Sequence, residues 1–106
     1  MKILFNKYEG AGNDFIIVKN SPQLIDPSDK ELIKGLCDRR FGIGADGLML
    51  IEDYDGSDFR MFYFNSDGSV GEMCGNGARC ASHFAMSHMT GFRDLTFMAG
   101  DGLHTA

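Results

Sequence analysis

The sequence has few cysteines, no excess of positive charge and no long apolar run. Its three cysteines, Cys37, Cys74 and Cys80, are an odd number without C-x-x-C spacing, and no His-x-x-x-His pair accompanies them. Neither a disulfide framework nor a zinc site is therefore indicated. Reduced thiols are the simpler interpretation.

The lack of apolar runs and of basic charge excludes further classes of protein. No stretch is long enough to span a membrane, and the apolar piece at residues 3–5 is too short for a secretory signal. A formal net charge of −5 argues against a nucleic-acid backbone as the main partner. We therefore expect a cytoplasmic protein without a membrane or nucleic-acid partner.

The 106 residues predict one α/β (α+β) domain, residues 1–106, or half of something larger. Ser28 and Glu31 form a capping box that predicts a helix to about Arg39, and a second helix is expected from Ala78 to about Met89. A final strand at residues 103–106 stops at the chain end, so we expect a chain cut within a longer protein. The other predicted strands are residues 3–8, 15–19, 48–51, 58–64, 70–73 and 95–98.

Two glycine-rich turns join these elements. Residues 9–14 connect the first two strands, where Asn13 serves either a hairpin turn or, as donor and acceptor, a zwitterionic ligand. Residues 42–47 match G-x-G-x-x-G spacing, but they follow a helix and enter a strand, which is the wrong order for a dinucleotide site. We interpret residues 42–47 as a loop that either joins two elements or lines a small-ligand pocket.

Residues 72–80 (Glu-Met-Cys-Gly-Asn-Gly-Ala-Arg-Cys) place Cys74 directly before a Gly-Asn-Gly step and the second helix. A helix N-terminus gathers unpaired backbone N–H groups and the positive end of the macrodipole, which both favour a thiolate over a thiol. The same N–H groups can hold a carboxylate, and glycines allow it to approach closely. The alternative is a packed cysteine at a helix start.

No histidine that could activate Cys74 is within reach. His83 lies roughly 13 Å further along the helix, which makes a cysteine hydrolase a weak interpretation. The five-residue spacing of His83 and His88 does not suit a shared metal. Cys74 fits better as a general acid/base toward a carbon acid. Cys80 cannot be the second base of a stereoinversion, because it lies about 9 Å further along and about 240° round the helix.

Four segments together resemble the N-terminal half of diaminopimelate epimerase: residues 9–15, 42–48, 64–69 and 73–80. The last segment alone is similar also to the proline racemase and phenazine-biosynthesis families. The resemblance implies a cofactor-independent (PLP-independent) isomerase that interconverts LL- and meso-diaminopimelate for lysine and peptidoglycan synthesis. It implies two pseudo-symmetric halves, each a mixed, mostly antiparallel β-sheet wrapped round a central α-helix, with the substrate between the halves.

The resemblance also implies roles for individual residues. Cys74 matches one member of a catalytic thiol/thiolate pair. Gly75 and Asn76 match the step at the helix start that binds substrate. Asn13 and Asn65 match side chains that hold the amino and carboxylate groups of the substrate.

Two features depart from the family pattern. Gly47 stands where many members have a glutamine that touches substrate. The second cysteine, and the arginine and glutamate that grip the far end of the substrate, belong to the C-terminal half, which we expect to be missing. The isolated chain is therefore expected to be an inactive half of an amino-acid epimerase whose partner is that C-terminal half. The alternatives are a non-enzymatic small-ligand-binding module, a homodimer of two such halves, and another member of the proline racemase/phenazine-biosynthesis superfamily.

Overall fold

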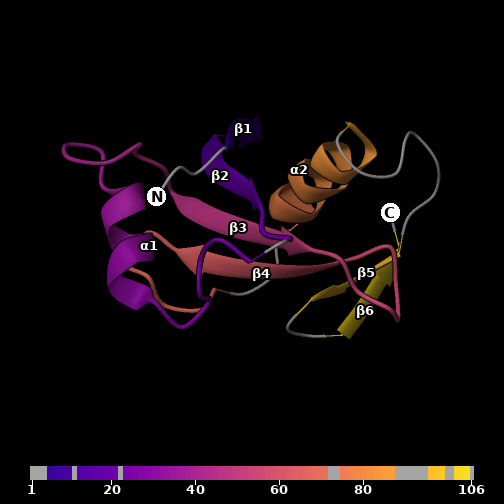
Figure 1. The fold of residues 1–106 in the computed structure, drawn as a ribbon. Helices are drawn as coiled ribbons and strands as arrows, with labels where there is room; N and C mark the ends of the chain where they lie inside the picture. Colours follow the sequence, from indigo (N-terminus) through magenta and orange to yellow (C-terminus); the bar gives the residue numbers. More distant parts are fainter. Residues whose placement is uncertain are drawn as a thin grey trace.

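The computed structural model describes residues 5–10, 12–21, 23–71, 75–87, 96–99 and 102–105. Within these ranges the chain forms a six-stranded mixed sheet and two helices (Figure 1). The strands lie in the sheet in the order in which they occur in the chain. The elements are β1 (Asn6–Gly10), β2 (Asn13–Lys19), α1 (Lys30–Cys37), β3 (Gly47–Glu52), β4 (Phe59–Asn65), α2 (Gly75–Ala85), β5 (Thr96–Ala99) and β6 (Gly102–Thr105).

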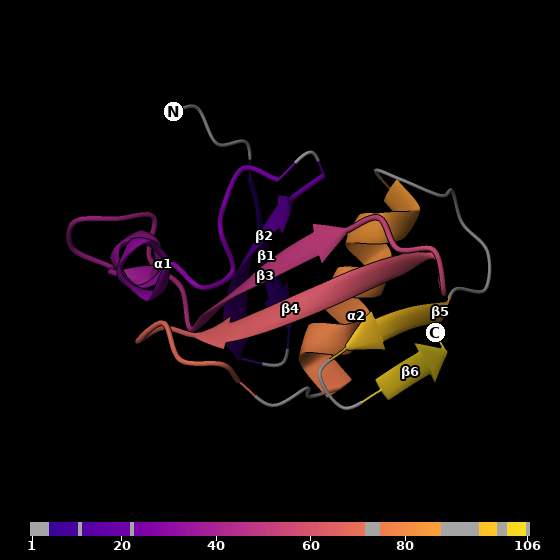
Figure 2. The same ribbon diagram turned by 60° about the horizontal axis from the view of Figure 1, so that its bottom comes forward.

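Antiparallel and parallel pairings alternate across the sheet. The pairs β1–β2, β3–β4 and β5–β6 are antiparallel, whereas β2–β3 and β4–β5 are parallel. A parallel pair needs a crossover connection, and each helix belongs to one: α1 lies between β2 and β3, and α2 between β4 and β5 (Figure 2). The predicted mixed, mostly antiparallel sheet is therefore confirmed.

The central strands are buried on both faces of the sheet. All six residues of β3 are buried, which explains its continuous apolar run. Alternate residues point to opposite faces, so that Ile17 and Met49 pack with Phe84 of α2, while Val18 packs with Ile33 of α1. The two helices thus cover opposite faces of one sheet, and α1 lies nearer one end than α2 does (Figures 1 and 2).

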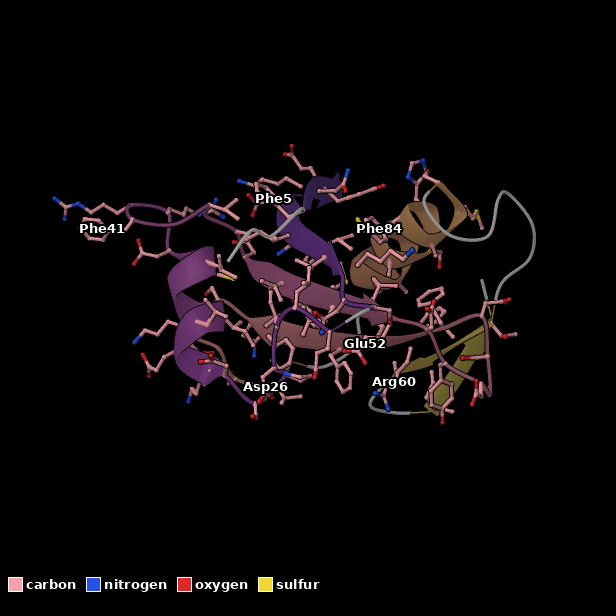
Figure 3. The ribbon with its side chains drawn as sticks, viewed as in Figure 1. Phe5, Asp26, Phe41, Glu52, Arg60 and Phe84 are labelled. Atoms are coloured by element: carbon pink, nitrogen blue, oxygen red, sulfur yellow. The ribbon has the colours of Figure 1, made fainter. Side chains whose placement is uncertain are left out.

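Most described residues of the helix α2 are buried, in agreement with the central helix that the family resemblance implied. Its anchor is Phe84, which points from the helix towards the sheet (Figure 3). The helix begins at Gly75, three residues before the expected Ala78. The Gly-Asn-Gly step is therefore its first turn, because tertiary packing outweighs the low helix propensity of glycine. Its buried residues include Cys80, Ala81, Ser82, Phe84 and Ala85.

The predicted capping box of α1 is wrong. Asp29 caps the helix instead, since its Oδ1 accepts the N–H of Leu32 at 3.2 Å. The Ser28 hydroxyl donates to Asp26 Oδ1 at 2.7 Å and is thereby engaged in the preceding turn. The helix also ends at Cys37, two residues before its expected end.

Strand positions agree with the sequence predictions to within two residues, with two exceptions. The first strand begins at Asn6, three residues later than expected, and residues 1–4 lie outside the described part of the chain. The strand expected at residues 70–73 is represented by a single bridge between Phe64 and Val70, since residues 72–74 are not described. The expected hairpin near the end of the chain is present as β5 and β6.

A buried amide fastens the loop that follows β2. Asn20 Nδ2 donates to the Ile25 carbonyl and to Glu52 Oε2, both at 2.8 Å, and Asn20 Oδ1 accepts the N–H groups of Leu24 and Ile25 at 2.9 Å. Glu52 also accepts a hydrogen bond from Arg60 at 3.1 Å (Figure 3). The buried Asn20 amide and Glu52 carboxylate therefore satisfy each other.

We predict that Asn20→Ala lowers the free energy of unfolding by roughly 3 kcal/mol, because several buried partners lose their hydrogen bonds at once. Urea unfolding followed by circular dichroism measures the change. The control is Gln23→Ala in the same loop, where the side chain is exposed and the expected change is within about 0.5 kcal/mol. Equal effects of the two substitutions would contradict the structural role of Asn20.

Candidate functional site

Three of the sequence-predicted positions lie at one end of the sheet, on the face that α2 covers. In the strand register Phe15 of β2 is opposite Gly47, and Gly47 is opposite Asn65 of β4. Asn13 lies two residues before Phe15 and therefore shares its face. Adjacent strands are about 4.8 Å apart, so Phe15 and Asn65 flank Gly47 across about 10 Å. The fold thus brings Asn13, Gly47 and Asn65 together.

Asn65 is held by the turn that follows β4. Its Nδ2 donates to Ser69 Oγ at 3.1 Å, and its backbone N–H donates to the Ser69 carbonyl at 2.8 Å. Ser69 is fixed in turn by Asp67, whose Oδ1 accepts from both the N–H and the hydroxyl of Ser69. These bonds lower the pKa of Asp67. The exposed Asn65 amide is therefore presented by a tight turn.

Asn13 is tied to the glycine-rich loop before β3. Its Nδ2 lies 3.5 Å from Asp46 Oδ2, and the same oxygen accepts the N–H of Asp14 at 3.1 Å. In return, the N–H of Asp46 donates to Asp14 Oδ1 at 2.9 Å. This reciprocal pair links the start of β2 to the residue before Gly47, which fixes the position of Asn13.

Arg39 completes this arrangement, and its role differs from the one that the sequence predicted. Its guanidinium donates to both oxygens of Asp14, at 3.1 and 2.8 Å, and to Asp46 Oδ1 at 3.1 Å. Lys7 adds an ion pair to Asp14 at 3.2 Å. The Arg39 hydrogen bonds hold the pKa of Asp14 well below its usual range. We refer to Lys7, Asp14, Arg39 and Asp46 as the clamp. Arg39 was expected to end a helix, but α1 ends at Cys37.

The glycines at positions 42 and 44 serve packing against the end of α1. A Cβ at Gly42 would lie 2.0 Å from the Gly35 carbonyl oxygen, and Gly44 has φ +84° with its Cβ position 2.9 Å from Arg39 Cα. The loop follows a helix and leads into β3, which confirms the order that argued against a dinucleotide fingerprint. These glycines allow the loop to pack against the end of α1, which brings Asp46 within reach of Arg39.

The predicted catalytic residue Cys74 lies outside the described residues. Gly75 is the first residue of α2, and Asn76 follows it in the first turn. The first turn of an α-helix carries backbone N–H groups without helical acceptors, at the positive end of the dipole. The helix start after Cys74 in the chain therefore offers backbone donors to an anion, and the substrate-binding roles of Gly75 and Asn76 stay predictions.

The remaining cysteines are buried, whereas His83 lies at the surface. Cys80 of α2 is buried in the core cluster on one face of the sheet, and Cys37, the last residue of α1, is buried in the cluster on the other face, where burial raises the pKa of its thiol to about 11. His83 is exposed, and its Nδ1 is 3.1 Å from the Tyr8 hydroxyl. It lies eight residues beyond Gly75, roughly 12 Å along α2. Among described residues, no three His, Cys, Asp or Glu side chains are arranged to hold a metal, and neither helix is long and apolar enough to cross a membrane.

A family model described as diaminopimelate epimerase matches residues 5–103. This chain belongs to the diaminopimelate epimerase family. Curated relatives of that name are 52% identical over 100 residues in Flavobacterium psychrophilum and 51% identical over 104 residues in Synechococcus. The chloroplastic diaminopimelate epimerase of Oryza sativa subsp. japonica is 43% identical over 102 residues.

These matches cover 94, 97 and 93% of this chain but 39, 34 and 29% of the relatives. The chain therefore spans about a third of the length of these members of the diaminopimelate epimerase family.

Solved structures share the fold at low sequence identity. A PhzF-family phenazine biosynthesis protein from Enterococcus faecalis superposes with a TM-score of 0.68 and 10% identity, over 97% of this chain and 38% of that chain. The corresponding values for a PhzF-family protein from Bacillus anthracis are 0.65, 17%, 97% and 33%. At such identities the likeness concerns the fold alone, and it supports the predicted fold class of this epimerase-family chain.

Sequence reasoning missed three residues of this candidate site. Arg39 and Asp46 act through the clamp, and Tyr63 covers Gly47, where a Cβ would lie 2.6 Å from its ring. No local pattern reveals the contacts of Arg39 with Asp14 and of Tyr63 with Gly47, because these residues are 25 and 16 positions apart in the chain. The Asn-Asp sequence at positions 13 and 14 was the available signal, but it reads equally well as a turn.

We predict that Arg39→Gln makes the stability of the chain less dependent on acid pH. Because the pKa of Asp14 is depressed in the fold, its stabilisation is complete above about pH 4 and is lost as the pH falls further. The free energy of unfolding, measured with urea, should therefore fall more steeply for the wild type between about pH 5 and 2.5. Arg40→Gln is the control, since Arg40 lies over the Phe41 ring and outside the clamp. Parallel curves for wild type and Arg39→Gln would refute the role of the pair.

Proposed function

We propose that this chain forms the N-terminal half of a diaminopimelate epimerase, which interconverts LL- and meso-diaminopimelate by a two-cysteine acid/base mechanism without a cofactor. The family match over residues 5–103 carries the proposal. The joint placement of Asn13 and Asn65 at one end of the sheet supports it.

In the proposed reaction, the Cys74 thiolate removes the α-proton from one face of the substrate, forming an S–H bond. The electron pair of the broken C–H bond is delocalised toward the substrate carboxylate. A second cysteine, on the missing half, gives up its thiol proton to the opposite face of the same carbon. In the reverse direction the two cysteines exchange roles, so protons and electrons balance.

The described residues supply the binding of the reacting end. Asn13 and Asn65 offer amide donors and acceptors to the amino and carboxylate groups of the substrate. The backbone N–H groups of Gly75 and Asn76 donate to the carboxylate, where negative charge develops during proton removal. The positive end of the α2 dipole favours the Cys74 thiolate.

This proposal needs a partner for the chain. Cys80 is buried in the core, and His83 is roughly 12 Å along the helix from Gly75, so neither supplies the second acid/base. A stereoinversion requires proton transfer on both faces of one carbon. The chain alone is therefore proposed to be inactive, and the missing C-terminal half is its proposed partner.

A chimaera tests the assignment of Cys74. Residues 5–103 replace the matching segment of the Flavobacterium psychrophilum relative, and incorporation of deuterium at the substrate α-carbon is followed in D₂O. We predict that the chimaera is active and that Cys74→Ser lowers its rate by about 100-fold or more. Cys80→Ala is the matched control and should retain activity, because Cys80 belongs to the core.

Two outcomes would reject the proposal. One is full activity of the Cys74→Ser chimaera. The other is an inactive, folded chimaera when the same graft taken from the Synechococcus relative is active, because that graft shows that the junctions are tolerated.

The isolated chain provides a separate prediction. With LL-diaminopimelate it should form no meso isomer above the rate without protein, because inversion needs an acid/base group on each face of the carbon and the chain holds one of the two. Turnover by the isolated chain that increases with the square of its concentration would instead favour the homodimer of halves.

A further inference from the structure

Tyr63 occupies the space that a side chain at position 47 would need. A Cβ built on Gly47 would lie 2.6 Å from Tyr63 Cε1 and 3.0 Å from the Tyr63 hydroxyl oxygen. Contacts this short require a shift, so a larger residue at position 47 would fit only if the Tyr63 ring and the Phe64 carbonyl moved. The phenol therefore lies over Gly47, although the register places Tyr63 opposite Met49, one pleat away.

A second glycine supports the other edge of the ring. A Cβ on Gly71 would lie 2.9 Å from Tyr63 Cε2 and 2.9 Å from Asn65 Oδ1. Gly71 also donates its N–H to the Tyr63 carbonyl at 2.9 Å. Two residues without side chains thus bracket one aromatic ring. The Asn65 amide and the Tyr63 ring meet at the same glycine.

The remaining contact fixes the direction of the ring. Phe15 packs against Tyr63 edge to face, with ring centroids 5.9 Å apart and an interplanar angle of 73°. Phe15 is buried, whereas Tyr63 is half-buried, so the phenol lies at the border of the core under α2. The hydroxyl end of the ring reaches Gly47, which stands between Phe15 and Asn65 in the sheet.

We infer that the Tyr63 hydroxyl is a further substrate-binding group, which contacts the reacting end of the substrate beside Asn65. This inference rests on the proposed function, since it places the hydroxyl in the same substrate site. Position 47 has no side chain of its own. Two polar atoms lie near the place where its Cβ would be, the Phe64 carbonyl oxygen and the Tyr63 hydroxyl oxygen, and only the second belongs to a side chain. The phenol thereby provides at Gly47 a hydrogen-bonding group that the main chain alone would lack.

Tyr63→Phe in the active chimaera separates this role from packing. The substitution keeps the ring between Gly47 and Gly71 and removes the oxygen alone. Loss of one hydrogen bond to a charged ligand group should raise KM for diaminopimelate about tenfold and leave kcat within about threefold. Tyr8→Phe is the matched control: its hydroxyl contacts His83 on α2, and the expected KM is that of the parent chimaera.

The possible results distinguish the inference from the function on which it rests. An active chimaera whose KM is unchanged by Tyr63→Phe overturns the role of Tyr63 and leaves the proposed epimerase intact. A tenfold fall in kcat without a change in KM also overturns it. A folded but inactive chimaera, beside an active Synechococcus graft, rejects the proposed function and this inference together. Urea unfolding of each variant identifies any change that stems from lost stability.

Discussion

Burial of β3 on both faces is the constraint on which the rest of this structure depends. A strand with six buried residues needs apolar cover above and below, and α1 and α2 provide it from opposite sides. Each helix spans a connection between parallel strands, so the same crossovers that bury the sheet also set its order. The start of β2, the start of β3 and the end of β4 consequently lie side by side at one end of the sheet, where Asn13 and Asn65 are placed.

The clamp fixes the start of β2 relative to the start of β3. Asp14 receives hydrogen bonds from Arg39 and from the backbone of Asp46, and Asp46 returns one to Asp14 and approaches the amide of Asn13. Bidentate pairing of a guanidinium with a carboxylate is directional, which suits it to positioning. Asp14 follows Asn13 and Asp46 precedes Gly47 in the chain, so these bonds fix the starts of β2 and β3 relative to each other.

Three glycines near the same end of the sheet each have a structural reason. Gly42 and Gly44 allow the loop to close against α1, whereas Gly47 leaves room for the phenol of Tyr63. A single type of residue thus serves two physical purposes, close backbone packing and space for a neighbouring ring. A motif search that reads these glycines as one pattern would assign them to nucleotide binding, and the order of the elements decides against it.

The sequence by itself determined the strands, the two helices and the residue types from which the site is assembled, because periodicity and turn chemistry are local properties. It could place Asn13 and Asn65 near strand ends, and through family resemblance it identified the chemistry proposed for Cys74. Only the tertiary structure decided that Arg39 pairs with Asp14 and that Tyr63 lies over Gly47. These contacts join residues 25 and 16 positions apart in the chain, and their geometry depends on how the sheet brings distant segments together.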